Sequence, residues 1–422
     1  MNFLKQAPAC WLSASLLLAG GSAWAQPQAA EMAASTALPV VTLQTALAQA
    51  MAQNPGLRAA QQAVAASEGA MIQSQARPNP ELAFSQEDTR RATRSSSLQW
   101  NQPIEIGGKR AARIKVAEHG VELARAELDT ARAALRADVR AAFANLLAAQ
   151  QRVQLNEKTL EIAAQARDAA AKRVMAGKAA PLEETKAQVA ESSAQLALNQ
   201  AQSGLRVARQ QLALLWGGSG IAVGEAMGDM VQLPQLPPQE QLLQKVEHSA
   251  QVVRAQQAYL QAKSTAELER AKRLPDPTVS VGIKRAEEAG RNQLLLGVSI
   301  PLPILDSNRG NQLQALRLAD KAEDELLAAR QLAQAQLLQN YEQLQTSRAQ
   351  TLQLQSKVLP GAQSAYEVAA KGFSLGKFSY LDVLDAQRTL ADARSLYLDQ
   401  LVATHRAAAD ITRQLGDIPG LE

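Results

Sequence analysis

Apolar residues recur every three or four positions along much of this 422-residue chain, the spacing that places them on one face of an α-helix. The longest such stretch runs from about 108 to 175, between Pro103 and Pro181. Its apolar positions mix small and large side chains: Val121, Ala124, Leu128, Ala131, Leu135, Val139, Ala142 and Leu146. The pattern predicts a coiled-coil helix about 100 Å long, then a turn at 176–181 and a return helix to about 215.

Four short segments alternate apolar residues with polar or small ones. Two lie at about 80–88 and 95–106, and two more lie in the C-terminal half. Their apolar positions are Leu82, Phe84, Leu98, Trp100, Val279, Val281, Ile283, Leu294, Leu296, Val298 and Ile300. A period of two, with one apolar and one polar face, is typical of a barrel strand between lipid and an aqueous lumen.

The order of these elements repeats along the chain. Ala170-Ala171-Lys172, followed by Gly177-Lys178, returns as Ala369-Ala370-Lys371, followed by Gly376-Lys377. We therefore predict two structural repeats, 26–215 and 241–422, joined by a Gly/Pro-rich linker at 216–240. Each repeat has a helix, two strands and a long helical hairpin. The remaining helices are expected at 42–75, 238–273 and 307–373, with a last one that ends near Gly416.

The N-terminus resembles a secretory signal peptide. Lys5 is followed by a short apolar run and by the small-x-small pattern at Ala23-Trp24-Ala25. We expect residues 1–25 to be removed, with cleavage after Ala25. The single cysteine, Cys10, lies in this segment, so the mature chain is expected to have neither a disulfide nor a thiolate ligand.

Composition narrows the function classes. The chain is 46% hydrophobic but only 3% aromatic, and its net charge is +4 with both signs interspersed. That balance does not favour nucleic-acid binding, and no later run is apolar and long enough for a spanning helix. His119, His248 and His405 are isolated, so we expect no metal site and no cofactor. The chain has no nucleophile elbow or phosphate-binding loop, and we expect no enzymatic activity.

Four strands cannot close a membrane barrel, because the smallest barrels need about eight. An open sheet edge in lipid would leave backbone groups without hydrogen bonds. The chain is therefore expected to pool its strands with other copies of itself, while its long helices project from the membrane.

At this point the whole mature chain resembles the outer-membrane factor (TolC) family. The segment Pro103-Ile104-Glu105-Ile106-Gly107-Gly108-Lys109-Arg110 resembles the strand-to-helix junction of the cobalt–zinc–cadmium efflux branch. The segment Pro301-Leu302-Pro303-Ile304, with Asn308-Arg309-Gly310, resembles the matching junction of the second half. The resemblance implies a mainly α fold with a small β part, in which a homotrimer shares a twelve-stranded β-barrel and an α-helical barrel.

The resemblance also implies a location and partners. The channel would lie in the outer membrane of a Gram-negative bacterium, with a long periplasmic portion. It would meet a periplasmic adaptor (membrane fusion) protein and an inner-membrane RND-type pump. We interpret the chain as a passive, gated conduit for heavy-metal cations, with selection left to the pump and the adaptor.

The family's hairpin tips, which dock onto the adaptor, match two turns of this chain. The residues are Val174, Met175, Gly177 and Lys178 in the first turn, and Phe373, Leu375, Gly376 and Lys377 in the second. The alternative is two ordinary helix–helix turns with an internal apolar contact.

Glu367 precedes the second tip, where the family's tunnel narrows, and is a candidate periplasmic gate. The alternative is a solvated helix face. Pro360-Gly361 is expected to break its helix. Lys109, Arg110 and Arg309 would anchor to lipid headgroups, pair with acidic neighbours, or be solvated charges.

Two further interpretations stay open at this stage. One is a drug or organic-solvent efflux channel of the same family, because the lining of a conduit need not encode its cargo. The other is a soluble periplasmic coiled-coil adaptor, although an adaptor has one hairpin between β-rich domains.

Overall fold

The computed structural model describes residues 40–218 and 223–421. The predicted signal peptide at 1–25 lies outside the described residues. Within them, no helix is both long and apolar enough to cross a membrane.

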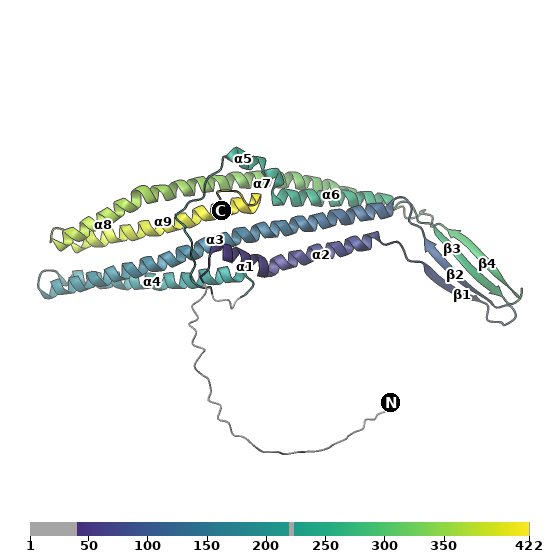
Figure 1. Ribbon diagram of the computed structural model, residues 1–422, viewed down its shortest axis with the longest axis horizontal. Helices are drawn as coiled ribbons and strands as arrows, with labels where there is room; N and C mark the ends of the chain where they lie inside the picture. Colours follow the sequence, from purple (N-terminus) through teal and green to yellow (C-terminus); the bar gives the residue numbers. More distant parts are fainter. Residues whose placement is uncertain (1–39, 219–222, 422) are drawn as a thin grey trace, which may run out of the picture. The chain divides into compact units, whose positions relative to one another are not determined.

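Helices dominate the described chain, and four strands interrupt them (Figure 1). The helices are α1 (Leu43–Gln53), α2 (Pro55–Gln75), α3 (Lys109–Met175), α4 (Pro181–Leu215), α5 (Gln239–Gln244), α6 (Ala250–Ala271), α7 (Arg309–Gln353), α8 (Leu359–Ser374) and α9 (Tyr380–Leu415). The strands are β1 (Glu81–Glu87), β2 (Ser95–Pro103), β3 (Thr278–Ala286) and β4 (Arg291–Ser299). This confirms the predicted fold class of long helical hairpins with a small β part.

The 67-residue helix α3 is the axis of the helical region. At 1.5 Å per residue it is about 100 Å long. It packs against α2 and α4, and also against α6 and α9, while α7 and α8 pack on α6 and α9. No extensive contact joins α7 to α2 or α4 within the described chain. The helices therefore form an open row, with α2 and α4 at one side and α7 and α8 at the other.

Small side chains let the helices approach closely. Leu146, Leu212 and Leu401 have no exposed surface and belong to one apolar cluster that joins α3, α4 and α9. Trp216 closes this cluster, and its indole N–H donates to the carbonyl of Ala46 at 3.1 Å. The predicted coiled-coil seam is thus largely a packed interior, as alternation of alanine with leucine or valine indicates.

The Gly/Pro-rich segment between the two halves forms no long helix or strand in its described part, and it lies against the helices. Val223, Ala226 and Met230 are buried in the same apolar cluster. Ala226 pairs with Val41 in an isolated parallel bridge. This segment therefore ties the start of the first half to the middle of the helical region.

The strands form one antiparallel sheet in the order β1-β2-β3-β4. β2 and β3 come from different halves of the chain and pair along their length, from Ser95 with Ala286 to Pro103 with Thr278. β1 and β4 are the two edges. The sheet therefore unites the two halves, and each half contributes one edge strand.

Several predicted boundaries were wrong in detail. The helix expected at 42–75 is two helices, because Pro55 restarts the chain as a new helix capped by Asn54, whose side chain accepts from the N–H of Leu57 at 2.9 Å. The helix expected at 238–273 is likewise divided, into α5, a 3₁₀ turn (Val246–His248) and α6. The second strand ends at Pro103 rather than 106.

Ile300, predicted as a strand residue, lies outside β4, which ends at Ser299. The last pair of the ladder is Ser299 with Thr278. Pro301 has no N–H to donate, and Pro277 precedes the partner strand. Neither chain can therefore continue the ladder past this pair.

The predicted break near Pro360-Gly361 takes the form of a π-helical turn, Leu354–Val358, between α7 and α8. Leu128 and Leu146 in α3 correspond to Leu326 and Leu344 in α7 at one constant offset. Beyond the π turn the offset is one residue longer, as for Ala170 and Ala369. The π turn therefore accommodates one extra residue in the second long helix.

Candidate functional site

One face of the sheet is apolar and exposed. The strand register aligns Phe84, Leu98, Ile283 and Leu294 in one row across all four strands. Leu82, Trp100, Val281 and Leu296 form the next row, and Val279 pairs with Val298 beyond it. Leu296 is 73% exposed and Phe84 is 67% exposed. A face of this kind is unstable in water and suits contact with hydrocarbon.

The opposite face is mostly polar or small. Ser85 and Ser97 lie in one of its cross-strand rows, with their hydroxyl oxygens 2.7 Å apart. Lys284 belongs to the same row and forms an ion pair with Glu87, with Nζ 2.7 Å from Oε2. The sheet thus separates an apolar surface from a hydrophilic one, which is the division a barrel wall requires.

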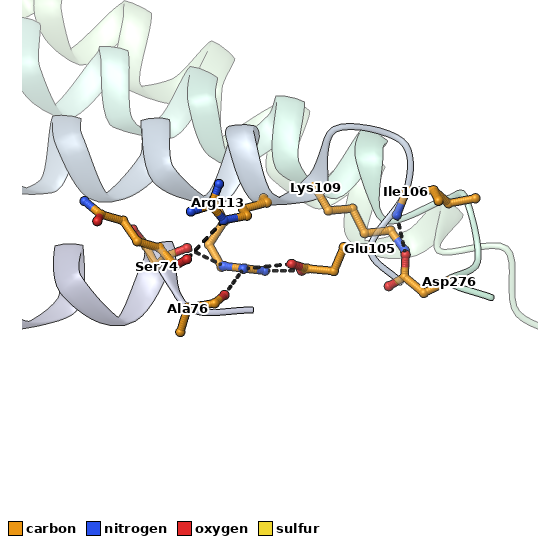
Figure 2. Close-up of polar contacts among 9 residues, drawn as sticks. Ser74, Ala76, Glu105, Ile106, Lys109, Arg113 and Asp276 are labelled. Carbon is orange, nitrogen blue, oxygen red and sulfur yellow. Dashed lines mark hydrogen bonds and ion pairs between the residues drawn. The ribbon is translucent and has the colours of Figure 1, made fainter. Parts of the chain in front are cut away.

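At the first strand-to-helix junction, Arg113 joins the end of α2 to the start of α3 (Figure 2). Its guanidinium donates to the carbonyls of Ser74 at 3.0 Å and Ala76 at 2.9 Å. It also makes a bidentate ion pair with Glu105, and this hydrogen bond raises the pKa of Arg113. Arg110 donates to the carbonyl of Gln75 at 3.0 Å. Two arginines therefore cap carbonyls at the C-terminal end of α2.

Asp276 holds the same junction to the second half of the chain (Figure 2). Its carboxylate accepts from the backbone N–H of Ile106 at 3.0 Å and lies 2.8 Å from Nζ of Lys109. The Lys109 side chain is only 11% exposed. Lys109 therefore pairs with an acidic neighbour, Asp276, which is one of the three roles considered for it.

The second junction uses different groups. Asn308 has a left-handed backbone, with φ of 56°, and its side-chain amide donates to both the carbonyl and the carboxylate of Glu269. Hydrogen bonds from Asn308 and then Lys272 lower the pKa of Glu269. Arg309 is exposed beside it. Both junctions are fixed to the preceding helix, although the residues that fix them are not equivalent.

The two hairpin tips share one backbone motif. In the first tip, the backbone N–H of Gly177 donates to the carbonyl of Val174 and that of Lys178 to the carbonyl of Arg173. In the second tip, 199 positions later, the N–H of Gly376 donates to the carbonyl of Phe373 and that of Lys377 to the carbonyl of Gly372. Both glycines have positive φ, 67° and 74°. This is the Schellman motif, in which glycine reverses the chain without steric cost.

The tips also differ in exposure. Met175 is 80% exposed and Leu375 is 63% exposed, whereas Val174 and Phe373 are half-buried. The Phe373 ring packs under the guanidinium of Arg173, 4.7 Å from the ring centroid. This contact joins the two tips, so part of the apolar surface is satisfied internally and part is free.

Glu367 is exposed on α8 and accepts a hydrogen bond from the side chain of Gln363 at 2.7 Å. Gln363 in turn accepts from Arg394 at 2.8 Å. His405 lies far along α9, with Nε2 3.0 Å from the carbonyl of Met230. No group of three or more His, Cys, Asp or Glu side chains suited to a metal ion occurs among the described residues.

Residues 46–218 and 242–417 match the family described as outer membrane efflux protein. The chain belongs to this family. It is 46% identical over 376 residues, 89% of this chain and 90% of the relative, to the cobalt-zinc-cadmium resistance protein CzcC of Cupriavidus metallidurans. The predicted resemblance to the outer-membrane factor family and to its cobalt–zinc–cadmium branch is confirmed.

Solved structures agree on the fold. The channel CusC aligns with a TM-score of 0.70 at 20% identity, covering 91% of this chain and 94% of that one. VceC of Vibrio cholerae aligns with a TM-score of 0.75 at 17% identity, covering 90% and 97%. The protein is therefore an efflux channel subunit of the Gram-negative outer membrane. The interpretation as a soluble adaptor is set aside.

Sequence reasoning did not find Arg113 or Asp276. Arg113 is one of many arginines on a long helix, and two of its partners are backbone carbonyls that any residue supplies. Asp276 had a usable signal, because Pro275-Asp276-Pro277 in the second half corresponds to Pro78-Asn79-Pro80 in the first, with a charged residue in the middle.

Replacing Arg113 with alanine is expected to destabilise the junction. The change removes the bonds to Ser74 and Ala76 and leaves the Glu105 side chain, which is 12% exposed, without its partner. We expect a loss of about 2–3 kcal/mol, seen as a lower midpoint in thermal unfolding followed by circular dichroism. The matched control is Arg125→Ala, whose ion pairs are half-exposed and worth at most about 1 kcal/mol. Equal midpoints for the two variants would contradict the proposed role of Arg113.

Proposed function

We propose that three copies of the chain close into one channel, with a twelve-stranded barrel in the outer membrane and a helical tunnel in the periplasm. The observation that carries this proposal is that the sheet and the helix row are both open at both sides. β1 and β4 are unpaired edges of the described sheet. In hydrocarbon their free backbone groups must find partners, since each costs several kcal/mol when unsatisfied.

Exposed apolar side chains on the outer helices support the same assembly. On α4, Leu182, Val189 and Leu196 recur every seven residues and are 60%, 59% and 65% exposed. On α7, Leu313 and Leu316 are about half exposed. A head-to-tail ring would place the α2 and α4 side of one copy against the α7 and α8 side of the next, and would cover both stripes.

We propose heavy-metal cations of the cobalt, zinc, cadmium and nickel type as the cargo. The support is the 46% identity to a protein named for cobalt, zinc and cadmium resistance. In this proposal the channel is a passive conduit without catalytic activity, and the metal is chosen by the pump and the adaptor. A drug or organic-solvent channel of the same family is the second candidate.

A clean deletion strain should distinguish the two cargoes. Loss of a metal-efflux channel should lower the tolerated concentrations of cobalt, zinc, cadmium or nickel, while tolerance of dyes, detergents and antibiotics stays unchanged. Growth on graded plates measures both, and complementation with the intact gene is the control. The reverse pattern would retain the channel architecture and overturn the metal assignment.

We further propose that the hairpin tips dock onto a periplasmic adaptor, which links the channel to an inner-membrane RND-type pump. Met175 and Leu375 are exposed apolar side chains beside the two Schellman turns. Lys178 and Lys377 follow the same turns and are exposed. An apolar contact bordered by basic residues suits an adaptor hairpin with an apolar tip and acidic neighbours.

The double variant Met175→Asp and Leu375→Asp should abolish metal resistance, because two buried carboxylates would be desolvated at the docking surface. Trimer formation and membrane insertion should persist, as judged by crosslinking and outer-membrane fractionation. Met227→Asp is the matched control, since Met227 is also exposed, at 59%, but belongs to the 216–240 linker and not to a hairpin tip. Resistance equal to wild type in the tip variant would exclude these residues from docking.

Glu367 is our candidate for the periplasmic gate. The hydrogen bond from Gln363, which itself accepts from Arg394, holds its side chain on α8. The family resemblance implies that the tunnel narrows along this part of the chain. A ring of three such carboxylates would attract cations.

Glu367→Ala should therefore reduce cation preference and change conductance in single-channel recordings of the purified protein. Glu342→Ala, which removes an exposed carboxylate from α7, is the control. Unchanged conductance and cation preference would leave Glu367 as an ordinary residue of a solvated helix face.

A further inference from the structure

The Glu87–Lys284 ion pair lies on the polar face of the sheet and connects β1 to β3 across β2. Nζ of Lys284 is 2.7 Å from Oε2 of Glu87, and the Ser95 hydroxyl on the intervening strand donates to the same oxygen at 3.1 Å. The Lys284 side chain is 28% exposed and that of Glu87 is 70% exposed. The lysine is therefore held against the sheet, while the carboxylate lies toward solvent.

The pair occupies the end of the sheet that is remote from the helices. β1 leads from α2 to its loop, and β3 leads from α6 to its loop, so Glu87 and Lys284 belong to the last rows before these turns (Figure 1). If the helices extend into the periplasm, this end of the sheet is the outer mouth.

Charges on the polar face are few and balanced. Strand alternation places Glu81, Glu87, Lys284 and Arg291 on this face of the four strands. The neighbouring Arg285 falls on the opposite face, where it contacts Glu287 at 3.2 Å. Arg291 shares the row of Glu87 but lies three strands away on β4, so within one copy Lys284 is the cation that pairs with Glu87 among the described residues.

We propose that Lys284 sets the ion preference of the outer mouth by neutralising Glu87. This inference rests on the proposed trimer, in which the polar face lines the pore. Three unpaired carboxylates around one opening would form an oxygen-rich ring that attracts divalent cations. Conduction requires weak binding at the exit. Lys284 therefore keeps an exported divalent cation from being retained where it leaves the channel.

The test measures ion selectivity of the purified full-length protein in planar bilayers. Reversal potentials in a KCl gradient give the cation-to-anion permeability ratio, and Cd²⁺ added on either side measures block. Lys284→Ala should raise the ratio about two- to fivefold and should create Cd²⁺ block from the sheet side only. Glu87→Gln should lower the ratio, and the double variant should return close to wild type.

Arg285→Ala is the matched control, because it removes the adjacent cation from the lipid-facing side and should leave the ratio unchanged. A conducting Lys284→Ala channel with wild-type selectivity and no new block would overturn the inference and leave the proposed channel intact. An equal effect of Arg285→Ala would also overturn it, since the effect would then be a general change of surface charge. A purified wild-type protein that crosslinks only as a monomer would overturn the proposed trimer itself.

Discussion

Unpaired backbone groups on the two outer strands of the described sheet are the constraint from which the architecture of this chain follows. Hydrocarbon supplies no hydrogen-bond partner, so in the proposed channel β1 and β4 are completed by strands of neighbouring copies. The sheet contains strands from both halves of the chain, and this requires the halves to lie side by side in one row. The row of helices is open at both sides as well, because α2 at one side leads into the edge strand β1 and α7 at the other side follows the edge strand β4.

The junction between sheet and helices has to keep the helices in the same side-by-side order as the strands. Each long helix begins with a residue in the left-handed region, Gly108 or Asn308, and is fixed to the helix that precedes the strands. In the first half two arginines supply the attachment by donating to backbone carbonyls at the end of α2, and in the second half an asparagine side chain does so. The two junctions are therefore fixed by different side chains. This indicates that the position of each long helix against the preceding helix matters more than the particular residues that hold it.

Local patterns were enough to predict the hairpins, the strands and the apolar face of the sheet. Leu82, Trp100, Val281 and Leu296 alternate within their own strands, and the structure adds that they form one row. Boundaries were less accurate where a helix-start signal lies inside a continuous helical pattern. At Asn54-Pro55, a capping residue and a proline begin a new helix although the apolar spacing continues. Contacts between distant segments were not predictable. Glu87 and Lys284 meet only because β2 and β3 pair, and a pattern of alternation does not specify that order of strands.

The extra residue in the π turn between α7 and α8 has a consequence for the symmetry of an assembly. Because each chain contains two repeats with one helical hairpin each, a ring of three copies would contain six hairpins and would have approximate sixfold symmetry. The turn at Leu354–Val358 exists in only one of the two hairpins, where the corresponding part of α3 is continuous. Hairpins with a continuous long helix would therefore alternate around the ring with hairpins that contain the π turn. The approximate sixfold symmetry would be reduced to exact threefold symmetry. Any motion that exploits the irregular backbone would be available to three hairpins, while the other three serve as a stationary frame.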